Sequence, residues 1–209
     1  MTDPHIKTRI TNHKVELRAD AEGKPAAALA GYAAMFGVES CEMWDIDLVD
    51  EDGEPFPFVE IIDPAAFDRT LHDKPDVRAL FNHDTSSVLG RTKSGTLALS
   101  VDEVGLVFVC QIPDTQVGRD VRTLVARGDI DGCSFGFRVV KSKVTHRDGQ
   151  PSIRTLLEVE LFEISPAVTF PAYEQTEVAL RARKARASKI AARLTPRLDH
   201  SRRQLSVEE

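Results

Sequence analysis

The hydroxyl of Ser134 lies inside an apolar run and is the first group in this chain with a potential for chemistry. The segment GDIDGCSFGF spans residues 128–137 and places Ser134 between Cys133 and Phe135. A buried serine is most often a small core residue whose hydroxyl bonds to the backbone. A serine nucleophile, in contrast, requires a base that removes its proton and a third group that orients the base. The nucleophile hypothesis therefore depends on both partners being present elsewhere in the chain.

Histidine is the most frequent general base, and the chain has six histidines. One of them, His83 in VRALFNHD, lies at the end of a strand-like apolar run. The other five lie in terminal segments, at the end of a predicted helix or in a predicted turn: His5, His13, His72, His146 and His200. A lone histidine at a strand end is more often structural than catalytic, so His83 is a candidate base that needs further support.

The candidate for the third group is a carboxylate in LLEVELFEIS, residues 156–165. Strand alternation groups Val159, Leu161 and Glu163 on one face. If the two apolar residues face the core, Glu163 points inward with them, where a carboxylate needs a cation or a strong donor such as a histidine N–H. A bulge near Glu163 would instead turn it towards solvent, and the pattern alone fits both alternatives equally well. Glu158 and Glu160 are close in sequence and remain alternatives for the third group.

The rest of the chain predicts mainly β-strands to position these residues. Apolar or alternating runs bounded by turn residues occur at HKVELRA, GYAAMFG, VRALF, TLALSV, GLVFVCQI and RTLLEVELFEIS. Hairpins are predicted at DEVG (102–105) and at HRDGQ (146–150). The lack of regular strand–helix alternation argues against a doubly wound parallel sheet. We therefore expect a mainly β (α+β) fold, with an antiparallel sheet that forms a barrel and two or three helices outside it.

Two segments predict helices. The first follows VEII, with Asp63 as its N-cap and Pro64 as its first residue. The second lies within DTQVGRDVRTLVARG, where apolar residues recur at helical spacing. Asp114 or Thr115 can cap the start of this second helix, and Gly128 can end it.

The length and composition indicate one domain with extensions, or at most two small domains, in a reducing compartment. The 209 residues are 42% hydrophobic, which is enough to form a core. The three cysteines, Cys41, Cys110 and Cys133, are scattered and lack metal-ligand spacing, which argues against a disulfide framework and a zinc site. No run has the length of a membrane helix, and the N-terminal MTDPHIKTRI lacks the apolar stretch of a signal peptide.

Charge is distributed unevenly along the chain. The net charge is −6, yet residues 181–209 carry nine basic and three acidic side chains, so residues 1–180 carry −12. A basic tail on an acidic body indicates a separate role for the tail. Within the body, CEMWDIDLVDEDGEPFPF (41–58) is acidic and broken by prolines, which predicts an exposed excursion to which the sequence assigns no role.

The ordered set of segments in this chain resembles the tailed-phage (caudovirus) prohead protease family. The segments that carry the resemblance are GYAAMFG, EIIDPAAFDRTL, VRALFNHDTSSVLGRT, DEVGLVF, GRDVRTLVARGDIDGCSFGF and LFEISPAVTFPAY. Together they cover about residues 30–179. The resemblance implies serine peptidase activity in capsid maturation. It also implies a fold similar to that of herpesvirus assembly proteases, a closed β-barrel surrounded by helices.

Site roles follow from the same resemblance. Ser134 would be the nucleophile and His83 the general base, while Glu163 would orient the histidine where the herpesvirus relatives use a second histidine. The chemistry would be acyl transfer without a metal or an organic cofactor. The resemblance assigns no oxyanion donors, cleavage-site preference or activation trigger.

Partners and location are also expectations from the resemblance. The substrates would be scaffold protein or the scaffolding segment of the major capsid protein, together with the protease itself, inside the assembling prohead in the host cytoplasm. Self-association as a dimer follows from analogy with the herpesvirus relatives, and no membrane partner is expected. We expect a prohead serine protease domain over residues 1–180 and a basic tail, helix-prone or disordered, over residues 181–209. The tail is either a self-cleaved delivery segment, a solvated extension or a non-specific contact for nucleic acid.

Two rival hypotheses remain open. A non-enzymatic capsid-assembly module could use the same barrel to bind scaffold, although the intact set of His83, Ser134 and Glu163 argues against it. A thiol peptidase could use Cys133, but strand alternation aims Cys133 at the face opposite Ser134.

Overall fold

The structure is a computed structural model that describes residues 7–11, 15–18, 28–45, 48–50, 52–73 and 75–168. The chain divides into two compact units, Met1–Ala172 and Tyr173–Glu209, and the second unit contains none of the described residues. The predicted boundary between a domain of residues 1–180 and a basic tail of residues 181–209 therefore lies outside the described residues and stays a prediction.

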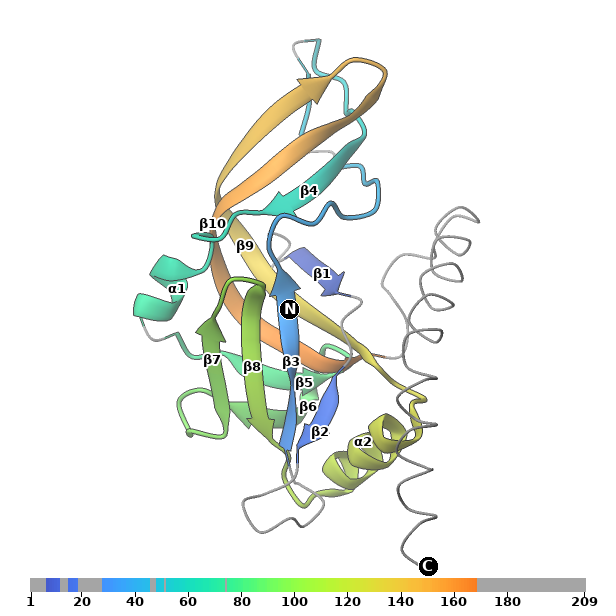
Figure 1. The fold of residues 1–209 in the computed structure, drawn as a ribbon, viewed down its shortest axis with the longest axis vertical. Coiled ribbons are helices and arrows are strands. Elements are labelled where there is room, and N and C mark those ends of the chain that lie inside the picture. The colour runs from blue at the N-terminus through green and yellow to red at the C-terminus, as the bar shows by residue number, and fades with distance from the viewer. Residues whose placement is uncertain are drawn as a thin grey trace, which may run out of the picture. The chain divides into compact units, whose positions relative to one another are not determined.

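The larger of two sheets is built around one long hairpin (Figure 1). This hairpin consists of β9 (Gly132–Arg147) and β10 (Gln150–Val168), and its turn is the predicted Asp148–Gly149 segment. The strand order is β1-β9-β10-β5-β6, and β4 pairs with β10 beside this path. The remaining strands of this sheet are β1 (Lys7–Thr11), β4 (Phe58–Ile62), β5 (Arg78–Phe81) and β6 (Asp84–Arg91).

The smaller sheet has four strands in the order β2-β3-β8-β7. They are β2 (Glu16–Arg18), β3 (Ala28–Met35), β7 (Leu97–Val101) and β8 (Gly105–Gln111). The predicted hairpin at DEVG joins β7 to β8 and is confirmed. Both sheets contribute to one hydrophobic core, which joins Leu106 and Phe108 of β8 to Phe135, Phe137 and Ile164 of the larger sheet. This shared core fixes β9 and β10 against the rest of the domain.

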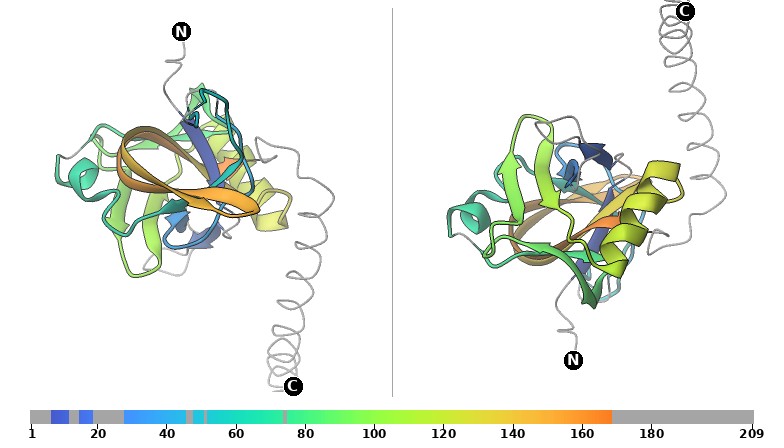
Figure 2. Two further views of the ribbon diagram at one scale, coloured as in Figure 1. Left: turned by 90° about the horizontal axis from the view of Figure 1, so that it is seen from above. Right: turned by 90° about the horizontal axis from the view of Figure 1, so that it is seen from below.

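Two helices lie on different sides of the sheets (Figure 2). Helix α2 (Gln116–Arg127) starts and ends as predicted: the Thr115 side chain accepts a hydrogen bond from the Gly118 N–H, and Gly128 closes the helix with φ of 76°. Helix α1 (Asp68–His72) is shorter than predicted. Residues 64–67 form turns, and the Asp63 carboxylate accepts a hydrogen bond from the Ala65 N–H at 2.9 Å instead of capping an α-helix.

The closed antiparallel barrel is not confirmed. In the described part of the chain the larger sheet ends at β1 and β6, the smaller one ends at β2 and β7, and these end strands do not pair with one another. Two pairings are parallel: β4 pairs with β10 at Ser152–Leu156, and β5 pairs with β10 at Glu163–Ala167. The length of β10, 19 residues, allows it to pair with different strands along its course. The fold is mainly β with two helices among the described residues.

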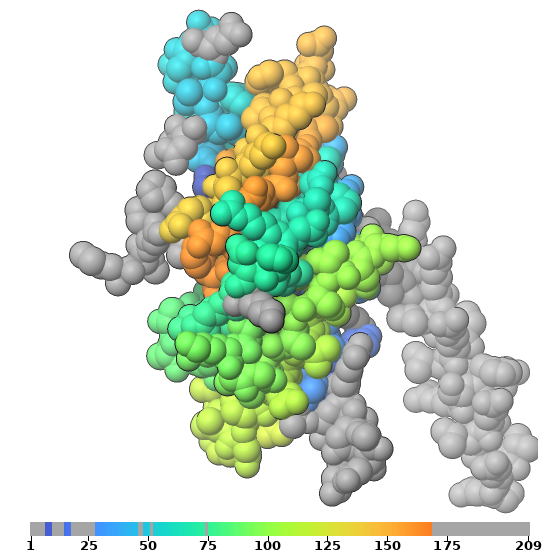
Figure 3. Space-filling view, turned by 90° about the vertical axis from the view of Figure 1, so that its left-hand side faces the viewer, coloured from blue at the N-terminus to red at the C-terminus, as the bar shows by residue number. Residues whose placement is uncertain are grey.

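The acidic segment before β4 follows the outer part of the β9–β10 hairpin (Figure 3). Its described residues form isolated bridges, including one between Met43 and Phe58, and no strand of their own. Trp44 is exposed, whereas Met43 is buried. No helix in the described ranges is both long and apolar enough to cross a bilayer.

Candidate active site

The pairing of β9 with β10 places the two predicted strand residues of the site on one face of the sheet. Ser134 is the direct partner of Ser165, and Gly136 is the direct partner of Glu163. Directly opposed residues share a face, and so do residues two apart in one strand. Ser134 and Ser165 are fully buried. Cys133 and Phe135 alternate to the other face and belong to the hydrophobic core.

Glu163 reaches this face through a bulge. The register of β10 shifts between Leu161 and Glu163, so that Leu161 pairs with Phe137 and Glu163 pairs with the next residue of β9, Gly136. The interpretation that Glu163 faces the core together with Val159 and Leu161 is therefore wrong, and of the bulge alternative the bulge is present but the orientation towards solvent is not. The bulge does not leave Glu163 free in solvent, because its side chain is 14% exposed and contacts His83.

His83 occupies a strained turn. Asn82 and His83 form the two-residue connection between Phe81 and Asp84, and both have positive φ, of 55° and 60°. This pattern is that of a type I′ hairpin turn, in which glycine and asparagine are favoured and histidine is rare. β10 holds both amides of the turn, because the Asn82 N–H donates to the Ala167 carbonyl at 3.1 Å and the His83 N–H donates to Ser165 Oγ at 2.9 Å.

The turn aims the His83 ring at the Glu163 carboxylate. Nδ1 of His83 lies 2.6 Å from Oε1 of Glu163, and the Ser165 hydroxyl donates to the other carboxylate oxygen at 3.1 Å. A carboxylate that accepts from Nδ1–H leaves Nε2 of a neutral imidazole as an acceptor. Nε2 is buried and has no hydrogen-bond partner among the residues that the structure describes. The ring is therefore oriented as a base with its accepting nitrogen available.

Ser165 links the two halves of this arrangement and was missed by the sequence analysis. Its hydroxyl accepts from the His83 amide and donates to Glu163, so it fixes both members of the pair. The available signal was its position two residues after Glu163 in FEIS, which places both side chains on one face of a strand.

Gly136 makes room for the Glu163 side chain. A Cβ atom at Gly136 would lie 2.5 Å from Glu163 Oε1, closer than any normal contact. A Cβ atom at Gly132 would meet the Cγ2 methyl of Val168 at 3.0 Å. The space beside these glycines is thus filled by side chains of β10 and is not an opening for a peptide backbone.

The Ser134 hydroxyl is engaged by the N-terminal strand. It donates to the carbonyl oxygen of Arg9 on β1 at 2.9 Å, and β1 runs antiparallel to β9 with Ile10 opposite Ser134. The structure therefore places His83 beside Glu163, and places Ser134 on the same sheet face with its hydroxyl turned to β1.

The alternative carboxylates have other partners. Half-buried Glu158 accepts from Arg69 at 2.6 Å, and exposed Glu160 accepts from Arg138 at 2.8 Å. Among the three candidates, Glu163 is the one that contacts His83.

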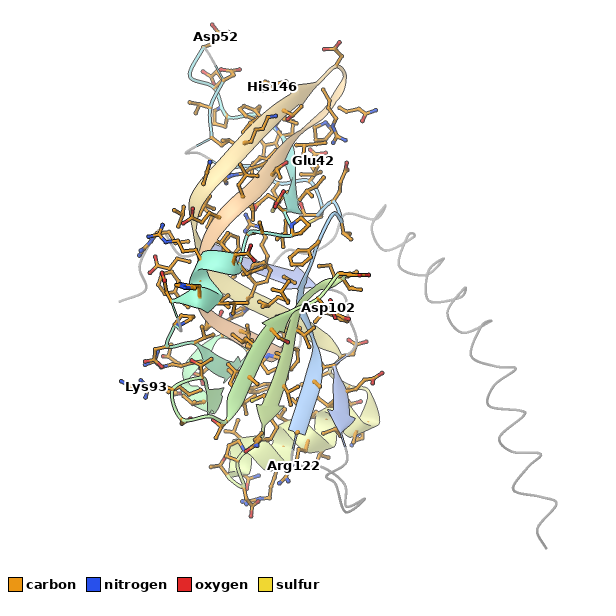
Figure 4. All side chains as sticks on the ribbon, turned by 60° about the vertical axis from the view of Figure 1, so that its left-hand side comes forward. Glu42, Asp52, Lys93, Asp102, Arg122 and His146 are labelled. Atoms are coloured by element: carbon orange, nitrogen blue, oxygen red, sulfur yellow. The ribbon has the colours of Figure 1, made fainter. Side chains whose placement is uncertain are left out.

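The other described histidines lie away from this group. His72 is exposed beside Asp73, and the ring of His146 lies 3.0 Å from Ser152 Oγ, towards the tip of the β9–β10 hairpin and far from Arg122 of α2 (Figure 4). His5, His13 and His200 lie outside the described residues. The catalytic roles of His83, Ser134 and Glu163 stay predictions.

The cysteines provide no activated thiol in the described part of the chain. Burial, together with the negative charge of Glu163, raises the pKa of Cys133 well above its ordinary value. Burial raises the pKa of Cys110 from 9.0 to about 12. A thiol that is held protonated is a poor nucleophile, which weakens the thiol-peptidase hypothesis. No group of three or more His, Cys, Asp or Glu side chains in the described ranges is placed to hold a metal ion.

Thiol labelling of the folded protein checks the cysteine environments. We expect a thiol reagent at pH 8 to modify exposed Cys41 rapidly and to modify Cys110 and Cys133 after unfolding. Because the pKa of Cys110 is raised by folding, its contribution to stability is present below about pH 9 and is lost as the pH rises towards about 12. Rapid labelling of Cys133 in the native protein would contradict this description.

A Gly136→Ala variant tests the bulge geometry. The added Cβ must displace the Glu163 carboxylate from His83, because the two atoms would otherwise be 2.5 Å apart. We expect the strongly hydrogen-bonded Nδ1–H proton of His83 to lose its downfield NMR signal, while the circular dichroism spectrum stays that of a folded β protein. Gly132→Ala is the matched control and keeps the signal, because its new methyl group meets Val168.

The chain was compared with curated sequences, solved structures and protein families. No curated protein sequence matches the chain significantly. The solved structure of the bacteriophage T4 capsid assembly protease, gp21, aligns over 81% of this chain and 100% of that chain, with 11% sequence identity and a TM-score of 0.48. The sequence matches the caudovirus prohead serine protease family over residues 13–190, which include His83, Ser134 and Glu163. The match covers most of the chain, which therefore belongs to the caudovirus prohead serine protease family.

Proposed function

We propose that this chain is a serine endopeptidase of prohead maturation, with Ser134 as nucleophile, His83 as general base and Glu163 as the group that orients the base. The observation that carries this proposal is the 2.6 Å contact between His83 Nδ1 and Glu163 Oε1 on the sheet face that also presents Ser134. Family membership supports a peptidase that works in the assembling capsid. The assignment of the three residues is the part that needs testing.

The geometry supports an acyl-transfer mechanism. Ser134 Oγ attacks a peptide carbonyl carbon while His83 Nε2 accepts the hydroxyl proton. The imidazolium then donates this proton to the departing amine, and a water molecule hydrolyses the acyl-enzyme with His83 again acting as base. Both half-reactions need Nε2 to be unprotonated at their start, and in the neutral ring the Nδ1–Glu163 contact selects the tautomer whose proton is on Nδ1.

Glu163 stabilises the positive charge that forms on His83 between these steps. A carboxylate 2.6 Å from the ring and 14% exposed is only weakly screened by water. The Ser165 hydroxyl bond keeps the carboxylate in position during the charge change. Glu163 is thus a positioning and electrostatic residue in this scheme, while Ser134 and His83 contact the reacting atoms.

The substrates and partners of this proposal are proteins confined with the enzyme in the immature capsid. The proposed substrates are the scaffold protein or the scaffolding segment of the major capsid protein, together with the enzyme's own chain. The basic segment of residues 181–209 would deliver the enzyme to the shell or scaffold and then be removed. No metal or organic cofactor takes part in the scheme.

Replacement of Ser134 by alanine provides the test. Intact mass is followed over time for the purified wild-type chain and for Ser134→Ala, each also co-expressed with the major capsid protein of the same phage. We expect discrete terminal fragments to be lost from the wild type, and the variant to react about 10⁶-fold more slowly or not at all.

Identical processing of both chains would contradict the proposal, because cleavage would then not depend on the Ser134 hydroxyl. Unprocessed chains and an uncleaved capsid protein in every sample would also contradict it. That second result would favour a non-enzymatic assembly module with the same fold.

A further inference from the structure

The N-terminal strand β1 lies where a peptide must lie to meet the Ser134 hydroxyl. It forms an edge of the larger sheet and runs antiparallel to β9 (Figure 1). An extended peptide that adds a strand to a sheet edge is a common mode of peptide recognition. The carbonyl that accepts the Ser134 hydrogen bond, at 2.9 Å, is that of Arg9. The peptide bond that faces the candidate nucleophile is therefore the bond between Arg9 and Ile10.

The Arg9 side chain is held by a buried carboxylate. Its Nη2 lies 2.6 Å from Glu60 Oε2 and 3.0 Å from Oε1, and its Nε lies 3.1 and 3.2 Å from the same two oxygens. The guanidinium also lies 5.7 Å from the centroid of the Phe137 ring. Bidentate pairing with a carboxylate is a feature that a planar guanidinium satisfies and an ammonium group does not, and arginine is also the more frequent cation over an aromatic face.

Glu60 is positioned independently of β1. It lies on β4 with 3% of its surface exposed, and its backbone N–H donates to Ser40 Oγ at 2.8 Å while its carbonyl accepts from the Ser40 N–H at 2.9 Å. Its neighbour across the β4–β10 pairing is Arg154, whose guanidinium contacts Asp45 and Ser142. A carboxylate this deeply buried needs a cation, and the cation it contacts here is Arg9.

A second acidic position recognises Lys7. Residues two apart in a strand share a face, so Lys7 lies on the same side of β1 as Arg9. Its ammonium group forms an ion pair with Asp45, which also accepts from Arg154 Nη1 at 3.3 Å. Asp45 comes from the acidic segment to which the sequence assigned no role. Lys7 and Arg9 thus each meet a carboxylate on this face of β1.

We propose that Glu60 is the specificity residue that selects arginine immediately before the cleaved bond, that Asp45 selects a basic residue two positions earlier, and that β1 is the first substrate. The inference rests on the proposed function, since it takes Ser134 as the nucleophile. Removing one partner from a buried ion pair is costly, so a peptide without the arginine leaves Glu60 unpaired and binds less well.

The reaction of β1 balances as an ordinary hydrolysis. Ser134 Oγ bonds to the Arg9 carbonyl carbon, the C–N bond to Ile10 breaks, and the serine proton passes through His83 to the new amine of Ile10. Water then cleaves the ester and leaves Arg9 with a free carboxylate. Until this segment departs, it occupies the sheet edge that any other peptide would need, so the intact chain is self-blocked.

The chain's own sequence contains further copies of the recognised pattern. A lysine or arginine two positions before an arginine occurs at residues 7–9, 181–183 and 184–186 and nowhere else in the 209 residues. Two of the three copies lie in the basic tail. The specificity inferred from β1 therefore places candidate self-cleavage sites after Arg183 and Arg186, in the segment that the proposed function removes.

The inference is tested by comparing two peptide substrates on the wild-type enzyme and two variants. Two synthetic peptides carry residues 4–15 of the chain, one with Arg9 and one with glutamine in its place. The wild type, Glu60→Gln and Glu103→Gln are produced as full-length chains, incubated until intact mass shows the loss of residues 1–9, and then assayed on both peptides, with Ser134→Ala as the blank. Glu103 is an exposed carboxylate in the β7–β8 turn and is the matched control. We expect the wild type and Glu103→Gln to prefer the Arg9 peptide in kcat/KM by roughly tenfold to 100-fold.

The preference should fall to about one in Glu60→Gln, and cleavage of the glutamine peptide by this variant shows that it is folded. A Glu60→Gln enzyme that keeps the arginine preference would overturn the inference, and so would Ser134-dependent cleavage at other bonds alone. Either result leaves the proposed function intact. Absence of Ser134-dependent cleavage in both peptides and in the chain itself would contradict the inference and the proposed function together.

Discussion

The contact between His83 Nδ1 and the Glu163 carboxylate constrains the whole of this site, because it holds only if three unfavourable backbone features coincide. Asn82 and His83 both adopt positive φ, which costs about 1–3 kcal/mol for each such residue. A bulge must shift β10 by one residue before Glu163. Position 136 must lack a side chain so that the carboxylate can cross it.

The surrounding fold supplies what offsets these costs. The shared core of the two sheets fixes β9 and β10, and two hydrogen bonds from β10 hold the amides of the strained turn. Ser165 takes part in one of these bonds and also bonds the carboxylate, so one small side chain couples the turn to the bulge. Strain that persists in a well-packed region, beside a buried acceptor nitrogen, is a feature of functional sites more than of plain structural ones.

The sequence predicted the local elements well and the long-range ones poorly. Helix α2 and both hairpins follow from capping residues and turn signals, which act over a few residues. The closed antiparallel barrel was not confirmed, because a 19-residue strand can pair in parallel with β4 and β5, and no local pattern encodes that choice.

Within the site, Glu163 was selected for an orientation towards the core that the bulge reverses. Strand β1 was missed because its sequence shows no hydrophobic periodicity. Its two charged side chains form ion pairs with carboxylates far away in the sequence, at positions 45 and 60.

Covalent labelling tests directly whether Ser134 is the nucleophile. The full-length chain is treated with a fluorophosphonate before and after the loss of residues 1–9, and the modified residue is identified by peptide mass mapping. We expect one adduct, on Ser134, in the processed chain, and little or none in the chain whose β1 still accepts the Ser134 hydrogen bond. An adduct on another residue, or none in the processed chain, would contradict the assignment of Ser134 as the nucleophile.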